Sequence, residues 1–119
     1  MNTEVSREDC CINYIEFNVA DIARSKDFYG KAFGWTFTDY GPNYCEFSDG
    51  NMKGGFSGDG PVTTGGPLVV LYGADLPALL NRIKAVGGKI VKPIFEFPGG
   101  LRFHFTDPDS YELAVWTEV

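Results

Sequence analysis

The sequence predicts an α+β fold in which two βαβββ modules form one curved mixed sheet, with the helices on its outer face. This prediction rests first on the pattern of apolar residues, in which the order strand–helix–strand–strand–strand occurs twice. A constant shift along the chain also aligns Ala20–Ile22 with Ala74–Leu76, and Gly34 with Gly88. Repetition of a whole series of elements indicates an internal duplication. The 119 residues are enough for one domain made of both modules.

The first module is assigned to residues 12–58 and follows an N-terminal tail at residues 1–11. Its first strand, 12–19, alternates between apolar and polar side chains, as a half-buried strand does. Asp21 is a suitable N-cap for a helix with one apolar face, and Gly34 is a suitable end for it. Turn-forming residues then separate three further strands, predicted at 35–40, 44–48 and 51–57.

A linker rich in Gly, Pro and Thr, residues 59–66, separates the first module from the second, residues 67–119. The second module begins with a short apolar strand at 68–72. Asp75 caps the second helix, and Gly87–Gly88 end it. Three strands follow, predicted at 89–97, 101–106 and 111–117. The linker is long enough for the modules to pair within one chain or to be exchanged between two chains.

Composition narrows the classes of partner. Sixteen acidic and ten basic residues leave a net charge of −6, which disfavours nucleic acid as a partner because phosphate binding needs clustered Lys and Arg. No apolar run approaches the roughly 20 residues that span a bilayer, so no membrane association is predicted. We expect a soluble, cytoplasmic protein. Its three cysteines, Cys10, Cys11 and Cys45, do not form a disulfide framework and have no neighbouring His in the sequence that would activate a thiol.

Four segments carry the motifs of a known family: Val19–Tyr29, Phe33–Trp35, Ala85–Gly88 and Phe105–Asp109. With them the sequence resembles the vicinal oxygen chelate superfamily, which contains glyoxalase I, the extradiol dioxygenases, and the fosfomycin- and bleomycin-resistance proteins. The similarity covers residues 12–117. One departure is the usual Asp-Pro-Asp-Gly-Asn turn, which here reads Asp-Pro-Asp-Ser-Tyr at residues 107–111. The resemblance implies the duplicated fold and a homodimer.

The resemblance also implies where a metal would bind. Metal-dependent members carry His, Gln or Glu at four positions on the concave strands, and counting from the shared motifs places these positions at Tyr14, Gly54, Leu68 and Ala114. Three of the four have no coordinating side chain. The sequence therefore predicts no metal and no other cofactor.

A different set of ligands is the alternative. His104 with Glu16 and Glu112 has the composition of a mononuclear iron site. A turn at Asp107–Ser110, however, sets Glu112 opposite Phe105, so His104 is predicted to point to the other face. A change of register by one residue would reverse that prediction.

The concave face is predicted to carry an aromatic and acidic lining. Strand alternation assigns to it five ligand-binding residues: Tyr14, Glu16, Phe56, Tyr72 and Trp116. Aromatic faces suit planar or cationic ligands, and a carboxylate suits an amine.

These features favour a metal-free, non-enzymatic binder of an aromatic or cationic small molecule, similar to the bleomycin-resistance branch. No catalytic residue is assigned. The alternatives are a metal-dependent lyase, isomerase or dioxygenase of the same superfamily, and a protein-interaction module with a vestigial pocket. Bound metal would distinguish the enzyme, and stabilisation by a ligand would distinguish the binder.

Overall fold

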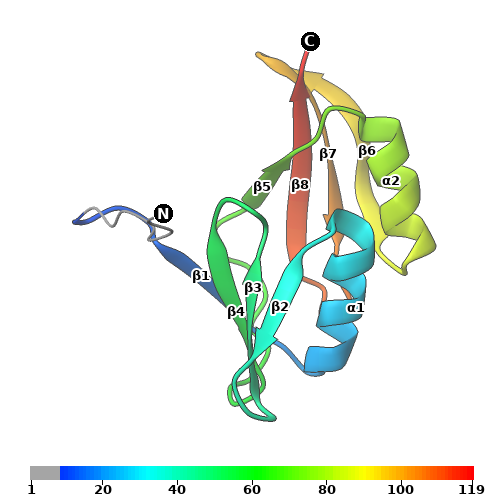
Figure 1. Ribbon diagram of the computed structural model, residues 1–119. Coiled ribbons are helices and arrows are strands. Elements are labelled where there is room, and N and C mark those ends of the chain that lie inside the picture. Colours follow the sequence, from blue (N-terminus) through cyan, green and yellow to red (C-terminus); the bar gives the residue numbers. More distant parts are fainter. Residues whose placement is uncertain (1–8) are drawn as a thin grey trace.

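The computed structural model describes residues 9–119, in which the two modules form two separate four-stranded sheets (Figure 1). The elements of the first module are β1 (Tyr14–Asn18), α1 (Ile22–Phe33), β2 (Thr36–Asp39), β3 (Tyr44–Ser48) and β4 (Lys53–Ser57). Those of the second are β5 (Val69–Tyr72), α2 (Leu76–Ala85), β6 (Lys89–Phe97), β7 (Gly100–Thr106) and β8 (Glu112–Glu118). The predicted α+β class and the repeated order of elements are confirmed.

Each module has the same topology. The first sheet has the strand order β1-β4-β3-β2, and the second has the order β5-β8-β7-β6. In each sheet the strand before the helix pairs in parallel with the last strand of its module, and the other pairs are antiparallel. In place of the one continuous curved sheet expected from the sequence, the modules meet through helices and side chains.

The helices begin and end where the capping residues predict. The Asp21 carboxylate accepts a hydrogen bond from the Arg24 backbone N–H at 3.2 Å, and Gly34 ends α1 with a left-handed φ of 74°. Asp75 caps α2 in the same way through the Ala78 N–H at 3.1 Å. Between residues 9 and 119, neither helix is long and apolar enough to cross a lipid bilayer.

One hydrophobic core serves both modules. The ring of Tyr29 on α1 stacks on Trp35 at 4.7 Å and on Phe56 of β4 at 5.4 Å, measured between ring centroids. On the same helix, Phe28 contacts Phe105 of β7 at 6.2 Å. Helix α1 therefore packs against both sheets, and it also contacts α2.

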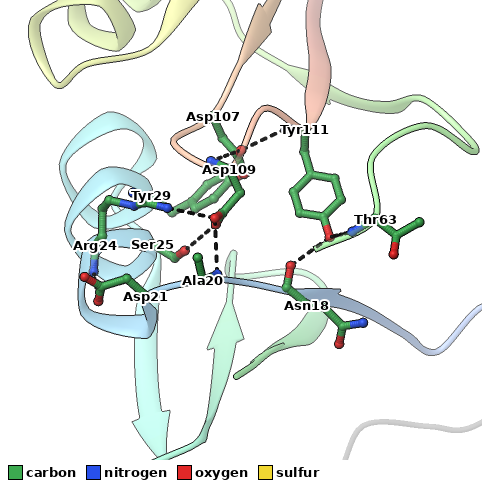
Figure 2. A network of polar contacts seen from close by, with 10 residues as sticks. All are labelled: Asn18, Ala20, Asp21, Arg24, Ser25, Tyr29, Thr63, Asp107, Asp109 and Tyr111. Carbon is green, nitrogen blue, oxygen red and sulfur yellow. Dashed lines mark hydrogen bonds and ion pairs between the residues drawn. The ribbon is translucent and has the colours of Figure 1, made fainter. Parts of the chain in front are cut away.

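The loop between β7 and β8 joins the second module to the first (Figure 2). The Asp109 carboxylate accepts hydrogen bonds from the Arg24 guanidinium at 2.7 Å and from the Ala20 backbone N–H at 3.2 Å. The Tyr111 hydroxyl donates to the Asn18 carbonyl oxygen at 2.7 Å. These partners lie at the end of β1 and the beginning of α1, so the loop fixes one module against the other.

A buried pair, Tyr29 and Asp107, lies at the centre of this contact. The Tyr29 hydroxyl donates to the Asp107 carboxylate at 2.7 Å. Burial raises the pKa of Asp107 above its usual range, and the hydrogen bond from Tyr29 opposes that shift because it stabilises the ionised carboxylate.

We predict that Tyr29→Phe lowers the free energy of unfolding at pH 7 by about 1–3 kcal/mol, because a buried carboxylate loses its phenol donor. The difference from wild type should shrink as the pH falls towards 3.8, the ordinary pKa of the group, because Asp107 becomes protonated in both proteins. Urea unfolding at several pH values measures this. Tyr40→Phe is the control, since Tyr40 is 61% exposed and its substitution should lower the free energy of unfolding only slightly. A loss that does not depend on pH would contradict the assignment.

Candidate functional site

Strand β1 presents different chemistry on its two faces. Glu16 is in register with Gly55 of β4, and Phe17 is in register with Phe56. Phe17 contacts the Phe56 ring at 6.2 Å within the core, whereas Tyr14 and Glu16 are exposed. The predicted alternation of β1 is confirmed, with Tyr14 and Glu16 on the face turned away from the core.

Glu16 ends a chain of hydrogen bonds on that face. The Tyr44 hydroxyl donates to the Glu16 carboxylate at 2.8 Å, and the hydroxyls of Tyr14 and Tyr44 lie 2.7 Å apart. Because Tyr44 has one hydrogen to give and Glu16 receives it, Tyr14 donates to Tyr44. Burial of the Tyr44 hydroxyl, together with both hydrogen bonds, raises the pKa of Tyr44. Gly55 allows this arrangement, since a Cβ there would overlap the Tyr44 hydroxyl.

Phe56 does not belong to this face. Its side chain is fully buried, and its ring stacks on Tyr29 of α1. The prediction that Phe56 lies beside Tyr14 and Glu16 is therefore wrong. The parallel pairing of β1 with β4 sets Phe56 beside Phe17, on the core side. Tyr44, in contrast, belongs to the face and was missed, because only the pairing of β3 with β4 brings it next to Gly55.

The other two predicted residues, Tyr72 and Trp116, lie together on the second sheet. They are in register on β5 and β8, and their rings meet edge to face with centroids 5.4 Å apart. The Tyr72 hydroxyl donates to Glu118 at 2.9 Å. Tyr72 is 55% exposed, so much of its ring is open to a partner.

A cavity of about 800 Å³ lies between β1, the linker and the β7–β8 loop. Residues 63–68 form one wall, and Ser110, Tyr111 and Glu112 contribute to another. Glu16 and His104 also line it, whereas Tyr14, Phe56, Tyr72 and Trp116 do not. The structure thus places the predicted ligand-binding residues in separate groups: Glu16 at this cavity with Tyr14 beside it, and Tyr72 with Trp116 on the second sheet.

His104 occupies the face opposite to the one expected. It is in register with Ala114, and Phe105 is in register with Leu113, one residue away from the predicted pairing. The loop spans five residues rather than four, because the Asp107 carboxylate accepts the backbone N–H groups of both Asp109 and Tyr111. His104 is 3% exposed, and its Nδ1 lies 2.7 Å from the Glu112 carboxylate.

The four family positions do not fit a metal ion. The Tyr14 hydroxyl is bonded to Tyr44, Leu68 is a partly exposed apolar residue and Ala114 is a buried methyl group. The expected concave position of Gly54 is wrong, because Gly54 faces the core, where the Phe47 ring and the Ile15 carbonyl oxygen occupy the space that a side chain would need. Gly55, which shares the face of Glu16, has no side chain to offer a metal either.

The alternative set of ligands, His104 with Glu16 and Glu112, is no better placed to hold a metal. Within residues 9–119, no three or more His, Cys, Asp or Glu side chains are grouped so that they could hold an ion. His104 and Glu112 form a pair, and Glu16 is hydrogen-bonded to Tyr44 instead.

Cys45 has the environment of a structural thiol. Its side chain is fully buried, and the Sγ atom contacts the Glu46 carbonyl oxygen at 3.5 Å. Burial raises the pKa of Cys45, which lowers the fraction present as the reactive thiolate.

We predict that Gly54→Ala destabilises the fold by about 1–3 kcal/mol, because the methyl group would overlap the backbone of β1 as well as the Phe47 ring. Gly58→Ala is the matched control: the atoms nearest to its Cβ are 3.7 Å away, and it should be neutral or slightly stabilising. Thermal and urea unfolding compare the two variants. Equal stabilities would show that β1 and β4 are not held this closely.

Comparison with known proteins agrees with the fold. The sequence pattern of the Glyoxalase/Bleomycin resistance protein/Dioxygenase superfamily matches residues 11–115. Two curated relatives are the Anthracycline biosynthesis proteins DauV of Streptomyces sp. (strain C5) and DnrV of Streptomyces peucetius. Each is 31% identical over 124 residues, covering 87% of this chain. The chain spans 45% of the length of each relative.

Solved structures give the same architecture at lower identity. A glyoxalase-related enzyme from Fulvimarina pelagi has a TM-score of 0.78 at 22% identity, over 92% of this chain and 88% of that one. A variant of the fosfomycin resistance protein FosX from Listeria monocytogenes, complexed with Mn(II) and 1S,2S-dihydroxypropylphosphonic acid, has a TM-score of 0.79 at 17% identity. That match covers 94% of this chain and 93% of the other. At these identities the likeness shows the fold alone.

Proposed function

Because this chain belongs to the glyoxalase/bleomycin resistance protein/dioxygenase superfamily, we propose that it binds a small aromatic or cationic molecule without a metal. The observation that carries the proposal is the chemistry of the family's metal positions. Tyr14, Gly54, Leu68 and Ala114 offer no set of donors, while aromatic and carboxylate side chains remain exposed on the sheet faces away from the core. Such faces suit binding through ring stacking and charge.

Two further observations support a small-molecule ligand. The cavity of about 800 Å³ falls within the usual size range of ligand pockets, roughly 300–1,000 Å³. The curated relatives are named for anthracycline biosynthesis, which associates this type of chain with small organic compounds. Our candidates for contact with a ligand form two groups: Glu16, which lines this cavity, with Tyr14 beside it, and Tyr72 with Trp116 on the second sheet. Glu16 is the candidate partner of a cationic group.

The function is tested with naphthalene probes on protein treated with a chelator. We expect neutral 2-naphthamide to bind and to quench Trp fluorescence, because Trp116 is partly exposed beside Tyr72. We also expect no stoichiometric zinc, nickel, manganese or iron(II) after incubation and gel filtration, measured by elemental analysis. One tightly held ion per chain, or binding that requires added metal, would contradict the proposal.

A variant separates the role of Glu16 from that of the aromatic rings. Glu16→Gln should weaken the binding of the cation 2-naphthylmethylammonium by roughly 1–3 kcal/mol and leave 2-naphthamide unchanged, because only the charge is removed. Both affinities are measured by calorimetry. Equal loss for both probes, or no loss for the cation, would remove Glu16 from the site.

We also propose a two-fold homodimer. Apolar side chains are exposed on the second sheet and beside the first, including Val70 of β5 at 42% and Ile12, which precedes β1, at 84%, and a partner copy would cover such surfaces. Light scattering at micromolar concentration should give twice the chain mass of 13.1 kDa. A mass near that of one chain would contradict the dimer.

A further inference from the structure

Two side-chain nitrogen atoms on β7 have no hydrogen-bond partner among residues 9–119, and both lie on the face away from the core. Phe103 and Phe105 point into the core, so Arg102 and His104 share the opposite face. Arg102 Nε and His104 Nε2 are buried side-chain atoms without a hydrogen-bond partner in the described part of the chain. Residues two apart on a strand are separated by roughly 6.5–7 Å, which is within the reach of one small molecule.

The surroundings of Arg102 are aromatic. Its guanidinium carbon lies 5.5 Å from the centroid of the Phe95 ring and 5.4 Å from that of Phe97. Trp116 is in register with Arg102 on β8, and its ring lies 6.2 Å from the Phe97 ring. These rings hold the planar guanidinium and also offer apolar area to a neighbouring aromatic ligand.

Arg102 has no carboxylate partner within residues 9–119, where it makes only the two ring contacts. The nearby carboxylates on this face are bonded to other groups, Glu118 to Tyr72 and Glu112 to His104. A buried N–H that is left unpaired is costly, so an acceptor that reaches this group gains a favourable hydrogen bond. Guanidinium groups bind carboxylates with two parallel hydrogen bonds, and partial burial strengthens that attraction.

His104 adds a second requirement. Its Nδ1 lies against the Glu112 carboxylate, which can only accept, so Nδ1 carries the hydrogen. In the neutral ring, Nε2 is then an acceptor, which suits a hydroxyl group on the same ligand.

From this arrangement we propose that the face formed by β5, β8, β7 and β6 binds an aromatic molecule through a carboxylate or similar oxyanion, held by Arg102. The proposal rests on the proposed function, because it specifies the chemistry of an aromatic ligand bound without metal. It adds a subsite of opposite charge to the one suggested for Glu16, on the other sheet.

The test compares 2-naphthoate with neutral 2-naphthamide, which has the same ring and nearly the same shape. For wild type we expect calorimetry to show about tenfold tighter binding of 2-naphthoate. Arg102→Gln should lower the affinity for 2-naphthoate to that for 2-naphthamide and leave the affinity for 2-naphthamide unchanged. Lys84→Gln is the matched control, since it removes one exposed positive charge from α2 and should preserve the preference.

The outcomes distinguish this subsite from the function on which it rests. If 2-naphthamide binds as tightly as 2-naphthoate to wild type, the Arg102 subsite is wrong and the aromatic site stands. If neither probe binds, both are wrong. The wild-type comparison needs no variant, and thermal unfolding checks that the variants are folded. Arg102→Lys keeps the charge without the planar fork and should retain only part of the preference. A full preference in Arg102→Gln would overturn the proposal.

Discussion

The arrangement of the molecule depends on the loop between β7 and β8, where two carboxylates of the second module accept hydrogen bonds from side chains of the first module. The Asp107 carboxylate accepts hydrogen bonds from backbone N–H groups of the loop itself and from the Tyr29 hydroxyl. The Asp109 carboxylate forms an ion pair with the Arg24 guanidinium. The same loop contributes Ser110 and Tyr111 to the cavity, so the contact that joins the modules also shapes the space between them. Substitutions in this loop would therefore change the stability of the fold and the shape of the cavity together.

Local signals in the sequence were sufficient for the elements of the fold. Asp21 and Asp75 fix the beginning of each helix through one side-chain hydrogen bond, and Gly34 ends α1 with a conformation that favours glycine. The alternation of β1 places Glu16 correctly because one face of that strand packs on the core. The separation of the two modules into two sheets was not predictable in this way, since it depends on contacts between residues that are far apart in the sequence.

The sequence is a weaker guide to the sheet face of a residue when that face depends on how the strands pair. The β7–β8 register differs by one residue because Asp107 binds two backbone N–H groups and adds Tyr111 to the loop, which moves His104 to the face of Ala114. Phe56 was misplaced because its neighbours Gly54 and Gly55 have no side chains that would reveal an alternation in β4. The apolar tyrosine and phenylalanine rings of this chain occur both in the core and on the exposed faces, so residue type alone does not separate them.

The exposed face of the first sheet offers the negative charge of Glu16, whereas that of the second offers the positive charge of Arg102, although the chain as a whole is acidic. Glu16 already accepts a hydrogen bond from Tyr44 and is exposed, so water and a neighbour satisfy it without a ligand. Arg102 has neither carboxylate nor hydrogen bond within residues 9–119, and its Nε is shielded from water. The unsatisfied group gains more from a partner than the satisfied one. Since salt screens the net charge of −6 over roughly 10 Å, the local environment of Arg102 decides which ligand is held more than the overall charge does.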